Sequence, residues 1–216
     1  MKTLIVDDHP LYREGLANLL QQIFPDACVE QAGDVHTALD VLARGGGTDL
    51  ILLDLKLPGL DGRTALPDLR RLYPAVPVVI VSAEDDTATI RACIDAGASG
   101  YIPKAARREV LAAALTVVAD GGVYLPPALR QLSSAPATMA WTPHAPPLTQ
   151  REREVLAGVC AGEANKVIAR RLDISEATVR AHLGSVFRAL GVANRTQAAL
   201  VARQLGILDG KSDSST

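Results

Sequence analysis

The first 120 residues of this 216-residue chain alternate short apolar runs with longer stretches in which apolar residues recur every three or four positions. The short runs predict five strands, at residues 3–7, 27–32, 49–54, 77–83 and 99–103. The periodic stretches predict five helices, at residues 10–23, 35–45, 64–72, 87–97 and 108–120. Because runs such as LILL have no polar face, both faces of the sheet are expected to be covered. The pattern therefore predicts an α/β fold with a doubly wound parallel sheet.

From Leu148 onward the pattern is helical throughout, which predicts an all-α second domain. Helix boundaries are marked by Thr149 with Glu152, by Gly162, by Ser175, and by Asn194 with Gln197. A short second helix within 163–173, a tight turn and a longer third helix over 175–191 predict a helix-turn-helix within a four-helix domain.

Between these two patterns lies a proline-rich segment with few periodic apolar residues. Its prolines are Pro126, Pro127, Pro136, Pro143, Pro146 and Pro147. Because proline lacks a backbone donor and restricts the residue before it, the segment is interpreted as an extended linker. The expected organisation is therefore a domain at 1–120, a linker at 121–147 and a second domain at 148–210.

Charge separates the same two parts. The whole chain has 22 basic and 24 acidic residues, a net charge of -2. The residues before Leu148 include 12 basic and 17 acidic side chains, net -5, whereas the remainder has 10 basic and 7 acidic, net +3. No stretch approaches the roughly 18 apolar residues of a membrane span, and no secretory signal is evident, so a cytoplasmic protein is expected.

Cys28, Cys93 and Cys160 are odd in number and widely spaced within apolar patterns. This arrangement favours buried, reduced thiols over disulfides or a metal site.

Acidic residues stand at the ends of two predicted strands. Asp7 and Asp8 end the first strand, and Asp54 ends the third. In the flavodoxin-like order 2-1-3-4-5 these strands are neighbours, so the three carboxylates would meet at the carboxyl edge, where such sheets bind ligands. Mutually repelling carboxylates favour a cation among them, and oxygen ligands suit Mg2+. The alternative is that these are ordinary acidic residues at solvated turns.

Two further strands end in residues that suit phosphoryl chemistry. Ser82 ends the fourth strand, where its hydroxyl could bond to a phosphoryl oxygen, and Lys104 follows the fifth, where its ammonium could offset phosphoryl charge. Each alone is also an ordinary surface residue. With Asp54 as the oxygen nucleophile, the product would be an acyl phosphate.

The motifs DDHPLYREGL, LLDLKLPGLDG, VVIVSA and GYIPK resemble the receiver domain of two-component response regulators, particularly the NarL/FixJ subfamily. The resemblance implies that Asp54 accepts a phosphoryl group from a histidine kinase. It implies a Mg2+ site formed by Asp7, Asp8, Asp54 and the main-chain carbonyl of Lys56, and a conformational switch at Ser82 and Tyr101. Many receivers place proline after the lysine, whereas here Pro103 precedes Lys104.

The predicted third helix of the basic domain has two faces. An apolar face contains Val179, Leu183, Val186, Phe187 and Leu190. The other face contains Ala177, Arg180, Ala181, Gly184 and Arg188. Small residues allow a helix to enter the major groove of DNA, and arginine can contact a guanine edge or a phosphate. The alternative is that the arginines are solvated surface charges; a net-positive domain that also contains Lys166, Arg170, Arg171, Arg195 and Arg203 argues for phosphate binding.

Residues 146–208 resemble the LuxR-type helix-turn-helix through LTQREREVL, NKVIARRLDISEATVRAHLGSVFRALGV and the following NR. The resemblance implies that Arg180, Ala181 and Gly184 face bases and that Lys166 and Arg188 contact phosphates. It also implies that the last helix, 195–206, supplies a dimer surface. At position 184 relatives often carry a larger side chain.

These features predict a DNA-binding transcriptional response regulator that is not a turnover enzyme, with phosphorylation of Asp54 controlling dimerisation and promoter binding. The expected partners are double-stranded DNA, a sensor histidine kinase and a second copy of the chain. Exposed residues near the first helix, among them Tyr12, Arg13 and Leu16, are candidates for kinase recognition.

Three other functions are weighed against this one. A flavodoxin-like redox protein would need a donor-rich loop after the first strand, but DDHPLYREG is acidic and would repel a flavin phosphate. A phosphatase with an aspartate nucleophile usually has a DxDx[TV] pattern on its first strand, which VDDHP lacks. The complete acidic set argues against a receiver that binds DNA without being phosphorylated.

Overall fold

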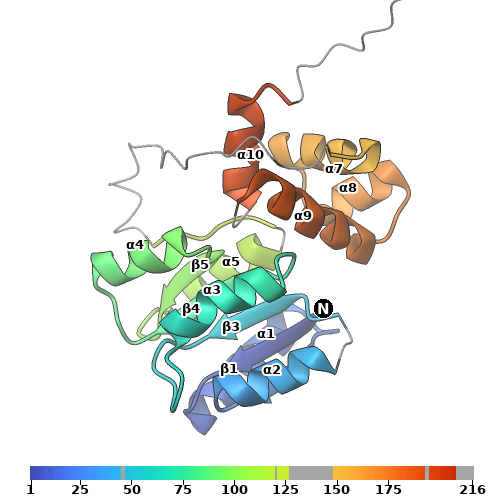
Figure 1. Ribbon diagram of the computed structural model, residues 1–216. Helices are drawn as coiled ribbons and strands as arrows, with labels where there is room; N and C mark the ends of the chain where they lie inside the picture. Colours follow the sequence, from blue (N-terminus) through green and yellow to red (C-terminus); the bar gives the residue numbers. More distant parts are fainter. Residues whose placement is uncertain (45–46, 120, 127–147, 193–194, 208–216) are drawn as a thin grey trace, which may run out of the picture. The chain divides into compact units, whose positions relative to one another are not determined.

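The computed structural model describes residues 1–44, 47–119, 121–126, 148–192 and 195–207 (Figure 1). The chain divides into two compact units, the first with the central sheet and the second helical. Among the described residues, no helix combines the length and apolar character that crossing a membrane requires.

The first unit is built on a five-stranded sheet. Its strands are β1 (Lys2–Val6), β2 (Cys28–Ala32), β3 (Leu50–Leu53), β4 (Val78–Ser82) and β5 (Gly100–Pro103). All neighbouring strands are parallel, and their order is β2-β1-β3-β4-β5, which confirms the predicted topology. Val6, the last residue of β1, lies opposite Ala32 of β2 and Leu53 of β3. The carboxyl ends of these three strands therefore form one edge.

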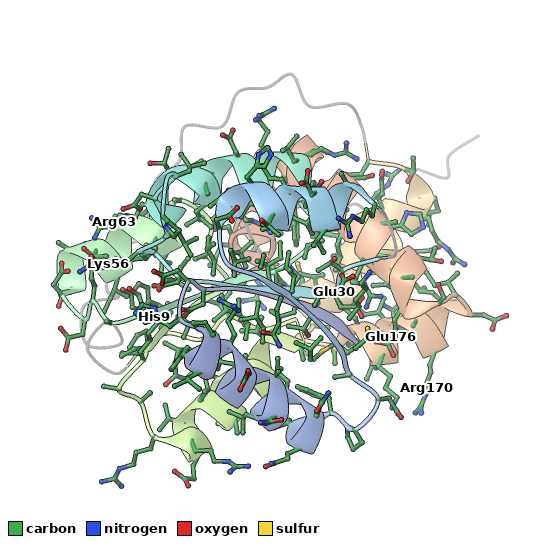
Figure 2. The ribbon with its side chains drawn as sticks, turned by 90° about the horizontal axis from the view of Figure 1, so that it is seen from below. His9, Glu30, Lys56, Arg63, Arg170 and Glu176 are labelled. Atoms are coloured by element: carbon green, nitrogen blue, oxygen red, sulfur yellow. The ribbon has the colours of Figure 1, made fainter. Side chains whose placement is uncertain are left out.

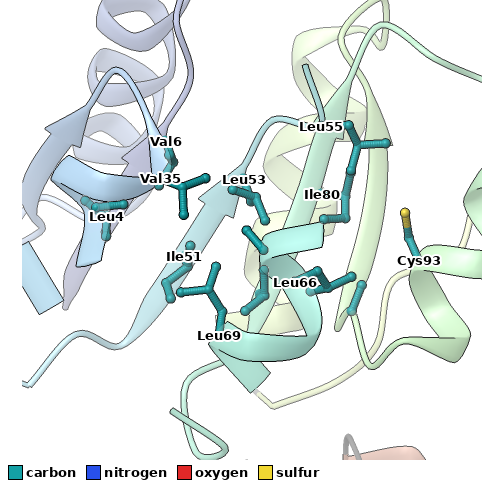
Figure 3. Close-up of a cluster of buried hydrophobic side chains, with 14 of the residues drawn as sticks. Leu4, Val6, Val35, Ile51, Leu53, Leu55, Leu66, Leu69, Ile80 and Cys93 are labelled. Atoms are coloured by element: carbon teal, nitrogen blue, oxygen red, sulfur yellow. The ribbon is translucent and has the colours of Figure 1, made fainter. Parts of the chain in front are cut away.

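Helices cover both faces of the sheet. They are α1 (Pro10–Ile23), α2 (Val35–Ala43), α3 (Gly62–Leu72), α4 (Thr87–Asp95) and α5 (Arg108–Ala119). Side chains alternate along each strand, so Leu4 and Val6 join the core under α2, α3 and α4 (Figure 3), whereas Ile5 joins the core under α1 and α5. The two-sided burial explains why β3, with the sequence LILL, is apolar at every position.

Aspartate side chains start three of these helices. Asp34, Asp61 and Asp86 are the N-caps of α2, α3 and α4. Each carboxylate accepts a hydrogen bond from a backbone N–H of the first helical turn, which would otherwise lack a partner within the helix. These carboxylates hold the helix starts at the same end of the sheet as the strand-end acids.

The cysteines differ from one another in burial. Cys93 of α4 is buried, Cys160 is partly buried, and all three thiols are free. Cys28 is exposed at the start of β2, so the prediction of three buried thiols is wrong at this position. The reason is topological: β2 is the edge strand beside β1, and its first residues have a neighbouring strand on one side only.

The chain after α5 returns to the sheet before it leaves the first unit. The N–H of Tyr124 donates to the carbonyl of Ser99 at 3.1 Å, and the N–H of Tyr101 donates to the carbonyl of Tyr124 at 3.3 Å. Tyr124 also packs against the core under α1 and α5. Residues 121–126 are therefore part of the first unit, which differs from a linker beginning at 121. The other residues of that segment, 127–147, lie outside the described residues.

The second unit contains α7 (Gln150–Cys160), α8 (Asn165–Leu172), α9 (Glu176–Leu190) and α10 (Arg195–Gln204) (Figure 1). The apolar face predicted for the third helix is buried, because Val179, Leu183 and Val186 of α9 pack against α7, α8 and α10. The predicted start at Asn194 and the domain's last residues, 208–210, lie outside the described residues.

Local signals at the helix starts of this unit are confirmed. Thr149 and Glu152 form a reciprocal capping box at α7. Ser175 caps α9 by accepting a hydrogen bond from the N–H of Thr178 at 3.0 Å. Between α8 and α9, Asp173 adopts a left-handed conformation with φ of 52°, which reverses the chain within a few residues. The result is a short helix, a tight turn and a long helix.

Candidate functional site

Two buried carboxylates meet where β1 and β3 end. The N–H of Asp54 donates to the carbonyl of Val6 at 2.8 Å, which places Asp54 directly beside Asp7. Asp7 is 1% exposed and Asp54 is 2% exposed. Burial of neighbouring like charges is costly unless a positive charge compensates them. The site therefore requires a cation.

Lys104 supplies one positive charge. Its Nζ donates a hydrogen bond to Asp54 Oδ2 at 2.7 Å and forms an ion pair with Asp7 Oδ2, also at 2.7 Å. Although partial burial lowers the pKa of Lys104, its hydrogen bond with Asp54 and the nearby charge of Asp7 outweigh this effect and raise the pKa above its ordinary value. The N–H of Lys104 also donates to the carbonyl of Ser82 at 2.7 Å, so β4 holds the lysine in place. Pro103 pairs with Ser82 at the end of β5 without displacing the lysine.

Asp8 and His9 complete the cluster on its solvent side. Ligand atoms of Asp7, Asp8, His9 and Asp54 lie within 4.8 Å of one another. The Nδ1 atom of His9 lies 2.6 Å from Asp8 Oδ1 and 3.2 Å from Asp7 Oδ1. Figure 2 shows His9 projecting at the same end of the unit as Lys56 and Arg63.

The residues of this cluster fit a divalent cation with a preference for oxygen ligands. Although Asp7 Oδ2 lies close to Lys104, it receives no well-aligned hydrogen bond from any described residue and is buried. The N–H of Lys56 donates to Asp54 Oδ1 at 3.3 Å, which brings the main chain at Lys56 next to the carboxylates. Carboxylate and main-chain oxygens are the ligands that Mg2+ prefers. Asp7, Asp8, Asp54 and the Lys56 carbonyl are the groups available to hold it.

Ser82 and Tyr101 lie on the adjoining strands and are both 0% exposed. Ser82 Oγ accepts a hydrogen bond from the N–H of Glu84 at 3.3 Å. The hydroxyl of Tyr101 donates to the carbonyl of Glu84 at 2.7 Å. Burial raises the pKa of Tyr101 to about 12, so its hydroxyl stays a donor at neutral pH. The carboxylate of Glu84 forms ion pairs with Arg63 and Lys56, which ties the same loop to α3.

Sequence reasoning missed the roles of two residues at the start of α1. Arg13 donates from its guanidinium to the main-chain carbonyl of Asp7 and to Gln31 Oε1, the latter at 3.3 Å. Tyr12 places its ring against Lys104. Both are half-buried, and Leu16 is only 3% exposed, so Leu16 is wrong as a surface candidate. The sequence signal that could have indicated the roles of Tyr12 and Arg13 is their position about one helical turn after Asp7 and Asp8.

The outward face of α9 is only partly as predicted. Ala177, Ala181 and Arg188 are exposed, and Arg180 is half-buried. Gly184 is buried, which corrects the expectation of an open surface at that position. Arg188 folds back along the helix, and its Nε donates to the Gly184 carbonyl at 3.3 Å.

The arginines around this helix have different roles. Lys166 and Arg170 are exposed on α8, and Figure 2 shows Arg170 projecting outward. Arg195 donates to the carbonyl of Glu163 and to Asn165 Oδ1, and burial lowers its pKa. Arg171 pairs with Glu163, and Arg203 donates to the carbonyl of Cys160. The last three stabilise the unit internally, so they add less to a phosphate-binding surface than the residue count suggests.

A sheet with a buried aspartate pair beside a lysine, together with a helix-turn-helix unit, is typical of DNA-binding regulators that contain a receiver domain. The family described as "Response regulator receiver domain" matches residues 3–116, and the family described as "Bacterial regulatory proteins, luxR family" matches residues 146–202. The chain belongs to the LuxR-type transcriptional response regulators of the NarL/FixJ subfamily.

Whole-length relatives have the same organisation. The chain is 40% identical to the glycerol metabolism activator of Pseudomonas putida, over 93% of this chain and 94% of the relative. It is 37% identical to the nitrate/nitrite response regulator protein NarP of Escherichia coli, over 94% of both chains. Among solved structures, a LuxR family DNA-binding response regulator from Silicibacter pomeroyi has a TM-score of 0.54 and 39% identity, covering 59% of this chain and 98% of its own.

Proposed function

We propose that this chain is a transcription factor switched by phosphorylation of Asp54, with a sensor histidine kinase as the phosphoryl donor. The observation that carries the proposal is the contact of one ammonium, Lys104 Nζ, with both buried carboxylates at 2.7 Å. This arrangement offsets the negative charge of Asp54 and places a positive charge where a transferred phosphoryl group would lie.

The chemistry is a transfer between two nucleophiles. A carboxylate oxygen of Asp54 attacks the phosphorus of a phosphohistidine, the P–N bond breaks, and the imidazole leaves with the electron pair and takes up a proton. An acyl phosphate forms on Asp54. Lys104 then shifts its hydrogen bond from Asp54 Oδ2 to a phosphoryl oxygen. Asp7, Asp8, Asp54 and the Lys56 carbonyl would hold Mg2+, which would supply further positive charge to offset the negative charge of the phosphoryl group.

A conformational response is expected at Ser82 and Tyr101. A phosphoryl oxygen on Asp54 would accept a hydrogen bond from the Ser82 hydroxyl, whose oxygen accepts from the N–H of Glu84, and Tyr101 is bonded to the same loop through the Glu84 carbonyl. The added charge thus acts on a local network of hydrogen bonds. We infer that this response controls dimerisation and promoter binding.

The surface beside α1 is the proposed docking site for the kinase. A groove of about 490 Å³ lies between α1 and the start of α5, and it is lined by Leu11, Tyr12, Lys104 and Arg108 among others. Leu11 is 84% exposed. We infer that the phosphohistidine-bearing helix of the kinase docks here, which replaces the earlier candidate Leu16 with Leu11.

The second unit is the proposed DNA reader. The small exposed residues Ala177 and Ala181 of α9 allow close approach to the major groove, with Arg180 toward bases and Lys166 and Arg188 toward phosphates. Gly184 is buried and has no side chain with which to contact a base. The α10 helix, on which Leu200 is 51% exposed, is the proposed dimer surface that would set the spacing of two half-sites.

The test of this function combines labelling with DNA binding. Wild-type protein incubated with acetyl phosphate and Mg2+ is expected to give one retarded band on a Phos-tag gel, and chelation of the metal with EDTA is expected to prevent it. The labelled protein is then used to select sites from random duplexes and for genome-wide mapping with and without the donor. Labelling without any effect on DNA binding would contradict phosphorylation control, and continuous release of phosphate would indicate an enzyme.

Arg180→Ala is expected to weaken binding to a selected site by about 1 to 3 kcal/mol, because a guanidinium at a base edge supplies direct readout. Electrophoretic mobility shifts on the selected site and on random DNA measure the effect. Arg153→Ala, an exposed arginine of α7, is the matched control and is expected to have little effect. An equal loss on both DNAs would identify Arg180 as a phosphate contact instead.

A further inference from the structure

The ring of Tyr12 lies against the ammonium of Lys104. The Nζ atom of Lys104 is 4.8 Å from the centroid of the Tyr12 ring, which is within the range of a cation–π interaction. Tyr12 belongs to the first turn of α1, four positions after Asp8. The helix that follows the strand-end acids therefore contributes a residue to the same site.

Three groups share this one ammonium. Two are the carboxylate oxygens of Asp7 and Asp54, and the third is the π face of Tyr12. The Lys104 side chain is only 15% exposed, so little water competes for it. A cation–π contact is stronger when the cation is desolvated. Burial and the charges of Asp7 and Asp54 raise the pKa of Tyr12 to about 12, so its ring remains neutral and electron-rich at neutral pH.

We propose that Tyr12 is a positioning residue for phosphoryl transfer, which holds the Lys104 ammonium beside Asp54 through the face of its ring. This inference rests on the proposed function. During transfer, Lys104 must exchange Asp54 Oδ2 for a phosphoryl oxygen. A neutral aromatic face keeps the ammonium in place during that exchange. A third carboxylate would bind the ammonium more strongly and would oppose its transfer to the phosphoryl oxygen.

A purely packing role for Tyr12 makes different predictions. The ring also packs against the core under α1 and α5, where a large apolar side chain of any kind would fill space. Leucine would then replace Tyr12 as well as phenylalanine does. The effect of the substitution would also persist when Lys104 carries no charge. The two roles are therefore separated by the choice of side chain and by a double-mutant cycle.

The experiment measures the initial rate of Asp54 labelling by acetyl phosphate and Mg2+. Tyr12→Phe keeps the aromatic face and is expected to stay within about twofold of wild type, whereas Tyr12→Leu is expected to be about fivefold slower. Lys104→Met keeps the stem and removes the charge, and adding Tyr12→Leu to it is expected to cause no further loss. Leu72→Ala, exposed on α3, serves as a remote control.

Equal rates for Tyr12→Leu and Tyr12→Phe would overturn the inference, and so would a fivefold loss that persists in the Lys104→Met background. Urea unfolding of wild type, Tyr12→Leu, Lys104→Met and the double variant gives the coupling free energy between Tyr12 and Lys104. This measurement requires no phosphoryl transfer. If wild-type protein takes no label, the proposed function fails and the positioning role fails with it, whereas the unfolding cycle still shows whether the Tyr12–Lys104 contact exists. Coupling between the two substitutions supports the contact, and strict additivity overturns it.

Discussion

Asp54→Ala is expected to abolish the retarded Phos-tag band that acetyl phosphate and Mg2+ produce with wild-type protein. Asp54 is the carboxylate that Lys104 and the Lys56 N–H hold at the end of β3. Asp7 is a poor substitute, because its Oδ1 accepts a hydrogen bond from the His9 N–H at 2.8 Å and its Oδ2 pairs with Lys104. Asp54 also shares Lys104, but its Oδ1 accepts a longer hydrogen bond, 3.3 Å from the Lys56 N–H, so this oxygen is less strongly engaged and is the better nucleophile.

The measurement is gel retardation together with the intact mass of the protein, before and after incubation with the donor. Asp40→Ala, which removes an exposed aspartate of α2, is the matched control and is expected to label at the wild-type rate. An unchanged band in Asp54→Ala would place the phosphoacceptor on another residue. Partial labelling of Asp54→Ala that disappears in a double variant with Asp8→Ala would identify Asp8 as a secondary acceptor.

Gly62→Ala is expected to lower the free energy of unfolding of the first unit by about 3 kcal/mol or more, the range of severe overpacking against a rigid neighbour. A Cβ atom at position 62 would lie 2.1 Å from the carbonyl oxygen of Asp54 and 2.9 Å from the Cα of Leu55. Both are backbone atoms that cannot rotate away. The N–H of Gly62 also donates to the Leu55 carbonyl at 2.8 Å, so α3 starts directly beside the main chain of Asp54, the proposed phosphoacceptor.

Urea unfolding followed by circular dichroism measures this loss, and the labelling rate of Asp54 is expected to fall with it because the Asp54 main chain must move. Gly15→Ala provides a control of opposite sign. Gly15 lies on the exposed side of α1 with no atom near its Cβ position, so alanine there is expected to add up to about 1 kcal/mol through helix propensity. Equal unfolding midpoints for Gly62→Ala and wild type would mean that α3 can shift without cost.

The architecture could be predicted from local patterns. Continuous apolar runs such as Leu50–Leu53 indicated strands buried on both faces, and the structure confirms each strand and the order of the sheet. Thr149 with Glu152 and Ser175 indicated helix starts that the structure also confirms. These signals succeed because capping and periodic burial depend on residues that are close together in the chain.

The predictions that differ from the structure depend on distant residues. Tyr124 pairs with β5 because the sheet offers a free edge there, although proline-rich sequence follows it. Cys28 is exposed because β2 is an edge strand, and Gly184 is buried although it lies on the face of α9 that was predicted to be open. The spacing of apolar residues does not predict these pairings and exposures. Each of them depends on whether a neighbouring strand, helix or side chain covers the residue.

For this protein, the sequence by itself determined two domains of opposite charge, the order of the elements, and which carboxylates and lysine stand at strand ends. Strand-end positions converge in any parallel sheet of this order, so Asp7, Asp54 and Lys104 could be assigned to one site before any coordinates were known. Only the tertiary structure decided that Tyr12 lies on Lys104, that Gly62 must lack a side chain, and that Leu16 is part of the core. Those facts depend on helix rotation and close approach, which are set by packing across the whole unit rather than by local pattern.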